Sequence, residues 1–382
     1  MGSRVGEGLV MVMPSAAPRQ SADELPVPTL WLLGRAQSGK SSIVRALTGC
    51  DGIVIGNGFS PCTRDTKAFE FPPGVSPALR FLDTRGLDET DYDPTVDIEV
   101  CGRMAHMIVV VMRIMDRNQD KVISIVDRLL HGNPYRPVLH VLTCLHEAYP
   151  GANHPDPYPF AGPPPWCSRQ LNLAEFNRLA RFQIEAMGHR ASRTVLVDIT
   201  EPENGLSPHD YGVESLKENI LDLLPATLRN GIPQNICGVD GAIDTVIHRH
   251  AWIAAAAGGV PIPGMDLVGV TAVQARMVSE LAKLLKSENM PSSFLNMLGP
   301  IVIATAGRRA AASLVKLIPW VGSMVGAISG AAINGVSTVA LGKVFVWYCR
   351  TTRPGAQPTM EEVGVEYRRR FAEAAKTWSG EA

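Results

Sequence analysis

Eight consecutive residues near the start of the chain combine glycine, lysine and serine at a spacing that binds phosphate. In such a loop the backbone N–H groups and a helix N-terminus surround an anion. The lysine neutralises the β- and γ-phosphates, and the serine hydroxyl ligates Mg²⁺. The stretch Gly34-Arg35-Ala36-Gln37-Ser38-Gly39-Lys40-Ser41 fits the pattern G-x-x-x-x-G-K-[ST] at every fixed position. The sequence therefore predicts a nucleoside triphosphate site, with these phosphate-binding residues: Gly34, Gln37, Ser38, Gly39, Lys40, Ser41 and Ser42.

Two flanking elements must hold this loop in place. The apolar run Thr29–Leu33 is typical of a short buried strand, and Ser42–Thr48 is typical of a helix that leaves the loop. Strand, loop and helix in this order are the context that the phosphate-binding pattern requires. A glycine-rich turn that only caps a helix is the weaker interpretation.

A second acidic motif follows at a strand end. Leu79–Asp83 is an apolar run that ends in an acid, and Thr84-Arg85-Gly86 completes the pattern D-x-x-G. Asp83 would hold the water shell of Mg²⁺, and Gly86 would let a backbone N–H approach a γ-phosphate. Between the two motifs lie the segment Ser60–Asp65, which reads S-P-C-T-R-D, and a strand-like run over Thr66–Phe71.

In the order and spacing of these three motifs, the chain resembles the Era-like branch of the translation-factor-related GTPases. Members of that branch carry T-R-D in the first switch and D-T-P-G in the second. The resemblance implies GTP and GDP as ligands, Mg²⁺ as cofactor, and Thr63 as the switch threonine that meets the metal ion. It implies catalytic roles for Lys40, Thr63, Asp83 and Gly86, and metal binding by Ser41, Thr63 and Asp83.

The switch motifs also depart from that family. Leu87 stands where many small GTPases carry a water-orienting glutamine, and since a hydrophobic residue there is also common in the Era-like branch, we expect slow intrinsic hydrolysis. Gln37 stands where potassium-activated relatives carry asparagine, and Arg85 replaces the usual proline of the second switch. Arg64 and Arg85 are open to two interpretations, as charge-stabilising fingers or as solvated side chains, and we favour the second.

The motif that would recognise the base is degenerate. Pro137–Leu142 predicts a buried strand, but Thr143-Cys144-Leu145-His146-Glu147 follows where the family has N-K-x-D. His146 holds the place of the guanine-binding aspartate, and a neutral imidazole is a poor acceptor for the N–H groups of guanine. Either Glu147 substitutes after a local shift, or selectivity for guanine is relaxed. Thr143, His146 and Glu147 are the candidate base-binding residues.

Two more segments complete the expected nucleotide domain at residues 27–230. Thr194–Thr200 predicts its last strand, after which the family's S-A-K is absent and Thr200 and Glu201 stand nearest. Residues 148–168 form a proline-rich insertion that excludes helix and central strand. This insertion could fold over the base, present a partner surface or be a plain surface excursion. Alternation of strands and helices predicts an α/β fold with a mainly parallel sheet.

The composition changes after residue 234, where we expect an all-α, hydrophobic helical domain at 234–350. Asp240–Ala257 and Asp266–Lys286 predict helices, and the helical spacing of the second turns Glu280 away from its apolar face. Leu317–Gly342 is a run of 26 residues without a charge. It is compatible with a membrane-spanning helix or with a buried hairpin, and we favour a compact domain that touches a membrane or a partner peripherally.

This half of the chain resembles the conserved helical domain of unknown function that follows Era-like GTPase domains in bacteria, several of which are membrane-associated. The shared features are His250-Ala251, the turn Pro261–Gly264, Gln274 with Met277, Leu317-Ile318-Pro319 and Thr338–Gly342. His248 and His250 do not share a helix face, which disfavours a metal site. Residues 1–26 are expected to form a flexible segment, and 351–382 a charged tail that ends in a helix over Met360–Trp378.

Composition limits the classes of function. With 382 residues, of which 46% are apolar, the chain can build two domains with sizeable cores. A formal net charge of −1 gives no electrostatic footprint for nucleic acid. Seven cysteines without a C-x-x-C spacing indicate reduced thiols in the cytoplasm.

Together these patterns predict a nucleotide-dependent switch that hydrolyses GTP with Mg²⁺ and is coupled to a helical effector or membrane-proximal domain. Guanine nucleotide is the expected partner, and a protein effector, a peripheral contact with the inner face of the membrane and a homodimer through the nucleotide domain stay open. The alternative is a non-hydrolysing, membrane-associated interaction protein whose nucleotide domain is a sensor or purely structural.

Overall fold

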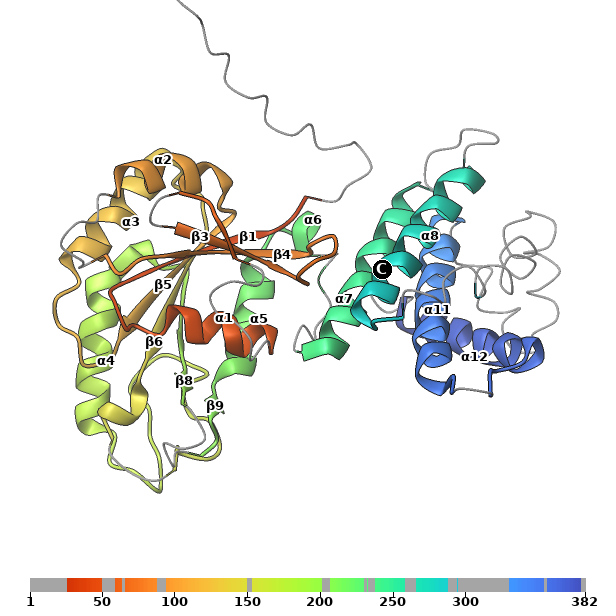
Figure 1. Cartoon of the computed structure of the whole chain (residues 1–382). Helices are drawn as coiled ribbons and strands as arrows, with labels where there is room; N and C mark the ends of the chain where they lie inside the picture. Colours follow the sequence, from red (N-terminus) through yellow and green to blue (C-terminus); the bar gives the residue numbers. More distant parts are fainter. Residues whose placement is uncertain are drawn as a thin grey trace, which may run out of the picture.

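The computed structural model describes most of the chain as an α/β domain and a helical domain that lie side by side (Figure 1). The described residues are 26–49, 59–63, 66–87, 94–149, 153–200, 207–229, 232, 238–257, 266–287, 294, 330–353 and 356–378.

A seven-stranded sheet forms the centre of the described α/β domain, in the order β2-β3-β4-β1-β5-β6-β7. β2, β3 and β4 pair antiparallel, whereas β4, β1, β5, β6 and β7 pair parallel. The prediction of an α/β fold with a mainly parallel sheet is therefore confirmed. The strands are β1 (Thr29–Gly34), β2 (Phe59–Pro61), β3 (Thr66–Phe71), β4 (Leu79–Thr84), β5 (Met107–Arg113), β6 (Val138–Thr143) and β7 (Arg193–Leu196).

Helices cover both faces of this sheet. Along β1, Trp31 and Leu33 pack into a core with α2, α3 and α4, whereas Leu30 and Leu32 pack into a core with α1 and α5. Burial on both faces explains why β1 reads as one continuous apolar run. The helices are α1 (Lys40–Thr48), α2 (Thr95–Met104), α3 (Asp120–Gly132), α4 (Ala174–Met187), α5 (Val213–Leu223) and α6 (Ala226–Arg229), with short 3₁₀ turns η1 (Leu145–Glu147) and η2 (Gly188–Arg190).

The last strand differs from the prediction over Thr194–Thr200. β7 ends at Leu196, and β8 (Asp198–Ile199) leaves the main sheet to pair antiparallel with β9 (Asp210–Tyr211). The reason is that the neighbouring strand β6 ends at Thr143. The last hydrogen bond between the two chain segments runs from the Val197 N–H to the Leu142 carbonyl, and β6 has no further backbone groups to pair with Asp198.

The proline-rich insertion has a core of its own. Its described residues, 148–149 and 153–168, contain no helix or strand apart from one isolated bridge at Asn153. The buried rings of Phe160 and Trp166 pack on Phe176 of α4, and Phe160 also contacts Tyr211 of β9. This packing favours a built-in structural element over a plain surface excursion.

The described helical domain consists of α7 (Gly238–Ala257), α8 (Asp266–Leu284), α11 (Gly330–Thr351) and α12 (Met360–Trp378). The three helices predicted over Asp240–Ala257, Asp266–Lys286 and Met360–Trp378 are confirmed as α7, α8 and α12. Helix α8 ends two residues before Lys286. A Cβ on Gly342 of α11 would lie 2.7 Å from Ile247 Cγ1 of α7 and 3.2 Å from Met277 Sδ of α8. Glycine there lets three helices approach closely. Residues 317–329 of the uncharged run lie outside the described residues.

One helix in the described part of the chain is long and apolar enough to cross a membrane. This segment of α11 covers the 20 residues Ala332–Thr351 with a hydropathy of 1.2, and 67% of its apolar 18-residue window is buried in the protein. It packs against α7, α8 and α12, as the central helix of a soluble bundle also would.

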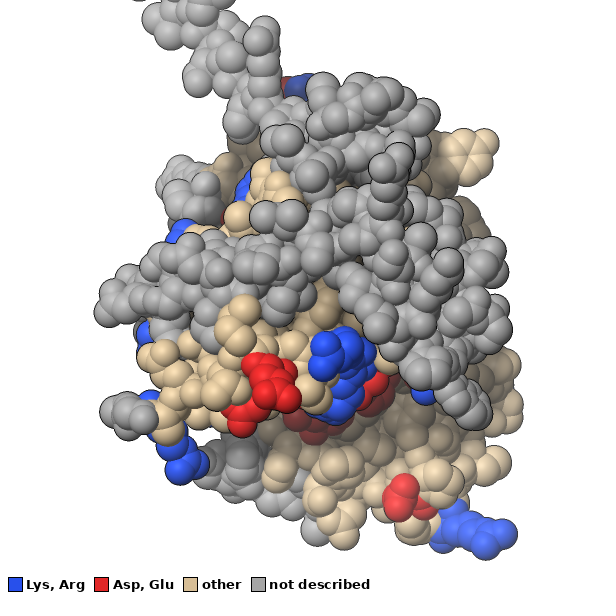
Figure 2. Space-filling model, turned by 90° about the vertical axis from the view of Figure 1, so that its right-hand side faces the viewer, with Lys and Arg blue, Asp and Glu red and all other residues tan. Residues whose placement is uncertain are grey.

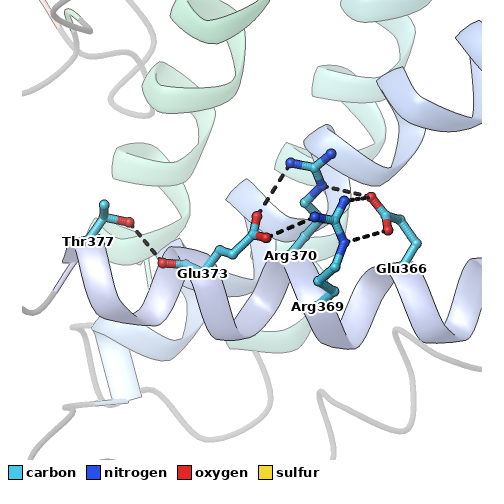
Figure 3. A network of polar contacts seen from close by, with 5 residues as sticks. All are labelled: Glu366, Arg369, Arg370, Glu373 and Thr377. Carbon is cyan, nitrogen blue, oxygen red and sulfur yellow. Dashed lines mark hydrogen bonds and ion pairs between the residues drawn. The ribbon is translucent and has the colours of Figure 1, made fainter.

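The C-terminal helix α12 carries a ladder of ion pairs (Figure 3). Glu366 accepts hydrogen bonds from Arg369 and Arg370, and the bond from Arg369 lowers the pKa of Glu366. Arg369 also contacts Glu373 at 3.0 Å. Such pairs, three and four residues apart, stabilise a helix. Seen from the side of the helical domain, acidic and basic side chains lie next to each other on the described surface (Figure 2).

The two domains touch at the hairpin between β3 and β4. The Ser76 hydroxyl in this hairpin donates to Glu280 Oε1 of α8 at 2.8 Å, and Arg276 donates to the Ser76 oxygen at 2.7 Å. His250 Nε2 of α7 lies 3.9 Å from the same carboxylate oxygen. Glu280 is only 6% exposed, so the prediction that it faces away from the core is wrong. Two of its partners, Ser76 and His250, come from other elements, which the periodicity of one helix cannot reveal.

Candidate nucleotide-binding site

The phosphate-binding loop (Gly34–Ser41) needs glycine at two positions for different reasons. A Cβ on Gly34 would lie 2.4 Å from the carbonyl oxygen of Val111 in β5, so β1 and β5 can approach only if Gly34 has no side chain. Gly39 adopts φ +91°, a left-handed conformation that glycine favours. The exposed Gln37 also has a positive φ of 58°. Both glycines of the pattern are thus required by the backbone.

The buried Lys40 folds back over this loop. Its Nζ donates to the carbonyl oxygens of Gly34 at 3.1 Å and Arg35 at 2.9 Å. α1 begins at Lys40, and its N-cap, Gly39, makes no side-chain hydrogen bond to the helix. The ammonium group is thus held against the loop, next to the N-terminus of α1, which is the kind of helix end that binds anions.

Ser41 and Asp83 form the pair of oxygen groups expected at a metal site. The Ser41 hydroxyl donates to Asp83 Oδ2 at 2.7 Å. Asp83 Oδ1 is buried and has no hydrogen-bond partner among the described atoms. Burial raises the pKa of Asp83, and the Ser41 hydrogen bond and the charges of Lys40 and Lys67 oppose this shift. A buried carboxylate oxygen without a donor is costly, and hydroxyl and carboxylate oxygens suit Mg²⁺, so these residues fit the ion.

The D-x-x-G segment lies against the phosphate-binding loop. A Cβ on Gly86 would lie 2.4 Å from the backbone nitrogen of Ala36, and the Leu87 N–H donates to the Gly34 carbonyl at 3.3 Å. The side chain of Leu87 is buried in the core with α2, so it cannot orient an attacking water molecule. Arg85 is exposed, and Arg64 lies outside the described residues.

Thr63 is engaged with α2. Its hydroxyl donates to the carboxylate of Asp97 and accepts the N–H of Thr66 at 2.9 Å. The neighbouring Cys62 places its Sγ 3.8 Å from Cys101 Sγ, also in α2. The structure thus brings Ser41 and Asp83 together but attaches the first switch to α2. Sequence reasoning missed Asp97 as a partner of Thr63, because Asp97 lies on helix α2, 34 residues away.

The base loop (Thr143–Glu147) is tied to the phosphate-binding loop through Thr143. The Thr143 hydroxyl donates to the Ser38 carbonyl at 2.8 Å, and a Cβ on Gly39 would contact the Thr143 methyl group at 3.6 Å. After Thr143 the chain turns sharply at Cys144, which has φ 55°. This turn begins η1 and brings His146 and Glu147 to the same end of the sheet as the loop.

His146 and Glu147 of the base loop each have a partner. The backbone N–H of His146 donates to Asp198 Oδ2 at 2.7 Å, and its ring Nδ1 lies 2.9 and 2.7 Å from the two oxygens of Asp198. Glu147 forms an ion pair with Arg113 at the end of β5, and this bond raises the pKa of Arg113. Sequence reasoning missed Asp198 and Arg113; the signal for Asp198 was an acid at the end of the last strand, next to a base motif that lacks one.

Comparison with known proteins agrees with this geometry. Residues 29–143 match the family model described as 50S ribosome-binding GTPase, and residues 238–372 match a domain of unknown function, DUF697. The chain carries a GTP-binding GTPase domain followed by a DUF697 domain. Both family resemblances found in the sequence are confirmed at this level.

Individual relatives match smaller parts of the chain. Magnetosome membrane protein 22 of Magnetospirillum gryphiswaldense is 38% identical over 113 residues, which are 28% of this chain and 58% of that protein. Translation elongation factor SelB from Methanococcus maripaludis, solved with a GTP analogue, is 13% identical over 52% of this chain and 34% of that one, with a TM-score of 0.29. The FeoB G-domain from Methanococcus jannaschii is 14% identical over 52% of this chain and 97% of that one, with a TM-score of 0.27.

Proposed function

We propose that this protein is a Mg²⁺-dependent GTP-hydrolysing switch that transmits its nucleotide state to the DUF697 domain. The observation that carries the proposal is the contact between Ser76 and Glu280. The hairpin that holds Ser76 joins β3 and β4, and these strands connect the two candidate switch segments. A single element therefore reaches both the candidate γ-phosphate contacts and the helical domain.

In this proposal the phosphates are bound by Lys40, by the loop N–H groups and by the N-terminus of α1. Ser41, Thr63 and the water shell of Asp83 would hold Mg²⁺, which neutralises charge on the phosphates when bound. Thr63 would have to release Asp97 to take part. Water would attack in line with the leaving group, and turnover is slow because the buried Leu87 offers no group to orient it.

The coupling follows from the connections of the hairpin. β3 begins three residues after Thr63, and β4 ends at Thr84, between Asp83 and Gly86. Six residue pairs join β3 to β4, so a displacement of either switch acts on the whole hairpin. An ordered switch in the triphosphate state and a released switch in the diphosphate state would then differ at Ser76.

The contact at Ser76 is sensitive to such a displacement. Glu280 Oε1 accepts from Ser76 and Arg276, while the buried Oε2 has no hydrogen-bond partner among the described atoms. Loss of the Ser76 donor leaves this carboxylate less satisfied, at a cost of about 1–3 kcal/mol. The first turns of α7 also touch the α/β core through Ala242, so α7 and α8 are both positioned to respond.

We place the nucleotide domain at 27–230, the helical domain at 234–350 and the charged tail at 351–382, in the cytoplasm. A peripheral contact of the helical domain with the inner face of a membrane is supported by the apolar α11 and by the name of the magnetosome relative. These two observations also support the alternative of a membrane-associated interaction protein that does not hydrolyse GTP.

Hydrogen–deuterium exchange of the full-length protein tests the proposed coupling. We expect the exchange of α8 and α7 to differ between the complex with GDP and the complex with a non-hydrolysable GTP analogue. Ser76→Ala should reduce this difference, whereas the matched variant Ser124→Ala, on the exposed side of α3, should preserve it. Identical exchange in both nucleotide states would overturn the proposal.

A further inference from the structure

Asp198 places a carboxylate directly behind His146, which stands where the base motif of the family has its aspartate. Its side chain is 1% exposed, whereas that of His146 is 33% exposed, so the imidazole lies between the carboxylate and solvent. The carboxylate bonds both the backbone N–H and the ring of His146. The residue that would face a bound base is therefore a histidine whose orientation is fixed from behind by an acid.

The partner of Nδ1 determines where the proton of this imidazole resides. A carboxylate has no proton to donate, so Nδ1 must be the donor in its bonds to Asp198. In a neutral imidazole the other nitrogen, Nε2, then carries one lone pair and acts only as an acceptor. With His146 in this neutral form, the position of the guanine-binding carboxylate holds a single acceptor.

A single acceptor atom cannot bind both N–H groups on this edge of guanine. A carboxylate can accept from both N1–H and the 2-amino group of guanine, whereas one lone pair can accept from N1–H alone. Hypoxanthine has the same N1–H and 6-oxo group but no 2-amino group. Adenine has no hydrogen on N1, so its ring nitrogen would meet the Nε2 lone pair without a proton between them.

Glu147 does not restore the missing acceptor. Its carboxylate is paired with Arg113, and the side chains of the two residues are 27% and 34% exposed. Rotating Glu147 toward a base would break a charge-assisted pair, which is stronger than a neutral hydrogen bond. The ion pair therefore disfavours the substitution by Glu147 that the sequence left open.

We infer that His146, held by Asp198, accepts a hydrogen bond from the N1–H of 6-oxopurine nucleotides and makes no hydrogen bond to the 2-amino group of guanine. The inference rests on the proposed nucleotide site and adds its specificity. GTP and ITP are then bound with similar affinity, and both are bound more tightly than ATP. Discrimination among purines is set at position 6 and at N1, not at position 2.

Equilibrium binding of GTP, ITP and ATP to the full-length protein, measured by calorimetry, tests this inference. The affinities for GTP and ITP should agree within about threefold, since only an unread amino group distinguishes them. The double variant His146→Asp/Asp198→Asn moves the carboxylate to position 146 and places a neutral amide at position 198. Two carboxylates therefore never lie against each other in this variant. It should bind GTP about tenfold more tightly than ITP, as expected for one recovered hydrogen bond.

Two single variants serve as controls. Asp198→Asn should weaken GTP and ITP equally, because the ring loses its fixed orientation but gains no second acceptor. His131→Asp, on the exposed end of α3, should leave all three affinities unchanged.

The wild-type ratio decides the inference even where a variant fails to fold. A wild-type preference for GTP over ITP of tenfold or more would overturn it and leave the GTPase assignment intact. Tighter binding of ATP than of ITP would also overturn it, because Nε2 would then be a donor. Absence of binding by all three nucleotides would contradict the proposed function itself.

Discussion

The phosphate-binding loop and the base loop, which we propose bind the two ends of one nucleotide, are built from different kinds of groups. The first relies on backbone geometry, with Gly34 and Gly39 required by a close approach and a positive φ. The second relies on side chains, and its acid is Asp198 instead of a residue of the loop. A backbone requirement such as a positive φ can be met by few residue types, so the sequence motif is preserved. A carboxylate that makes a side-chain hydrogen bond can instead be supplied by a residue on another strand.

This difference has a functional consequence. In the proposed site Lys40 and helix α1 neutralise the charge on the phosphates, which are the same in every nucleoside triphosphate. In the same proposal, selection of the base depends on His146 and Asp198. We therefore expect changes in the phosphate-binding loop to remove binding altogether, and changes in the base loop to alter which purine is bound.

Lys40→Ala should have the largest effect. It removes the charged donor from the β- and γ-phosphates, and we expect GTP affinity to fall by about 100-fold or more, as for the loss of a charge-assisted hydrogen bond in a buried site. Calorimetry with GTP and Mg²⁺ measures this. Lys121→Ala, on the surface of α3, is the matched control and should bind as the wild type does. If Lys40→Ala lowered the affinity for GTP by less than threefold, Lys40 would not be the group that binds the phosphates.

Gly86→Ala should have the next largest effect. Its Cβ would be forced to within 2.4 Å of the Ala36 backbone, so the second switch must move away from the phosphate-binding loop. We expect a weaker affinity for GTP and a loss of stability of about 1–3 kcal/mol, measured by chemical denaturation. Gly132→Ala has open space around its Cβ and should leave both quantities nearly unchanged. Equal behaviour of the two variants would argue against the close contact.

Ser41→Ala should act through Mg²⁺. The substitution removes a hydroxyl ligand and leaves Lys40 and the loop N–H groups in place, so GTP binding should become less dependent on Mg²⁺. Titrations with Mg²⁺ and with a chelator give the ratio of affinities for the wild type and for the variant. An unchanged ratio would remove Ser41 from the metal site.

Asp83→Asn should change the pH dependence of stability, with the smallest effect. Burial raises the pKa of Asp83 above its usual 3.8, so between the unfolded and folded pKa values the folded state binds more protons. This contribution is fully present below 3.8 and is lost as pH rises through the raised pKa. Thermal melts of nucleotide-free protein from pH 4 upward should show a shallower decline in the variant.

Asp127→Asn offers the opposite sign for comparison. Its bond from Arg190 lowers the pKa of Asp127, so its contribution is present above the unfolded pKa and is lost as pH falls through the lowered one. If both variants changed the melts in the same direction, burial would not be the cause of the shift at Asp83.

The phosphate-binding loop could be predicted from sequence because its requirements are local. Eight adjacent residues, a strand before them and a helix after them carry the whole pattern, and the structure has β1 and α1 where they were expected. The D-x-x-G segment was equally predictable, since Asp83 lies one residue before the end of β4, after a largely apolar run.

The partners of His146 and Glu280 could not be predicted in this way. Asp198 is 52 residues from His146, and Ser76 is 204 residues from Glu280. Helical periodicity placed Glu280 outside because it counts only neighbours on α8. Whether a charged side chain is buried depends on which distant groups meet it, and that is set by tertiary packing.

Single-turnover hydrolysis by the full-length protein tests the central claim most directly. Protein in excess over γ-labelled GTP is followed with Mg²⁺ and with a chelator, beside Lys40→Ala. The account predicts slow conversion of GTP to GDP and phosphate that requires both Mg²⁺ and Lys40. GTP that stays intact in the presence of Mg²⁺, or a rate that Lys40→Ala leaves unchanged, would contradict it.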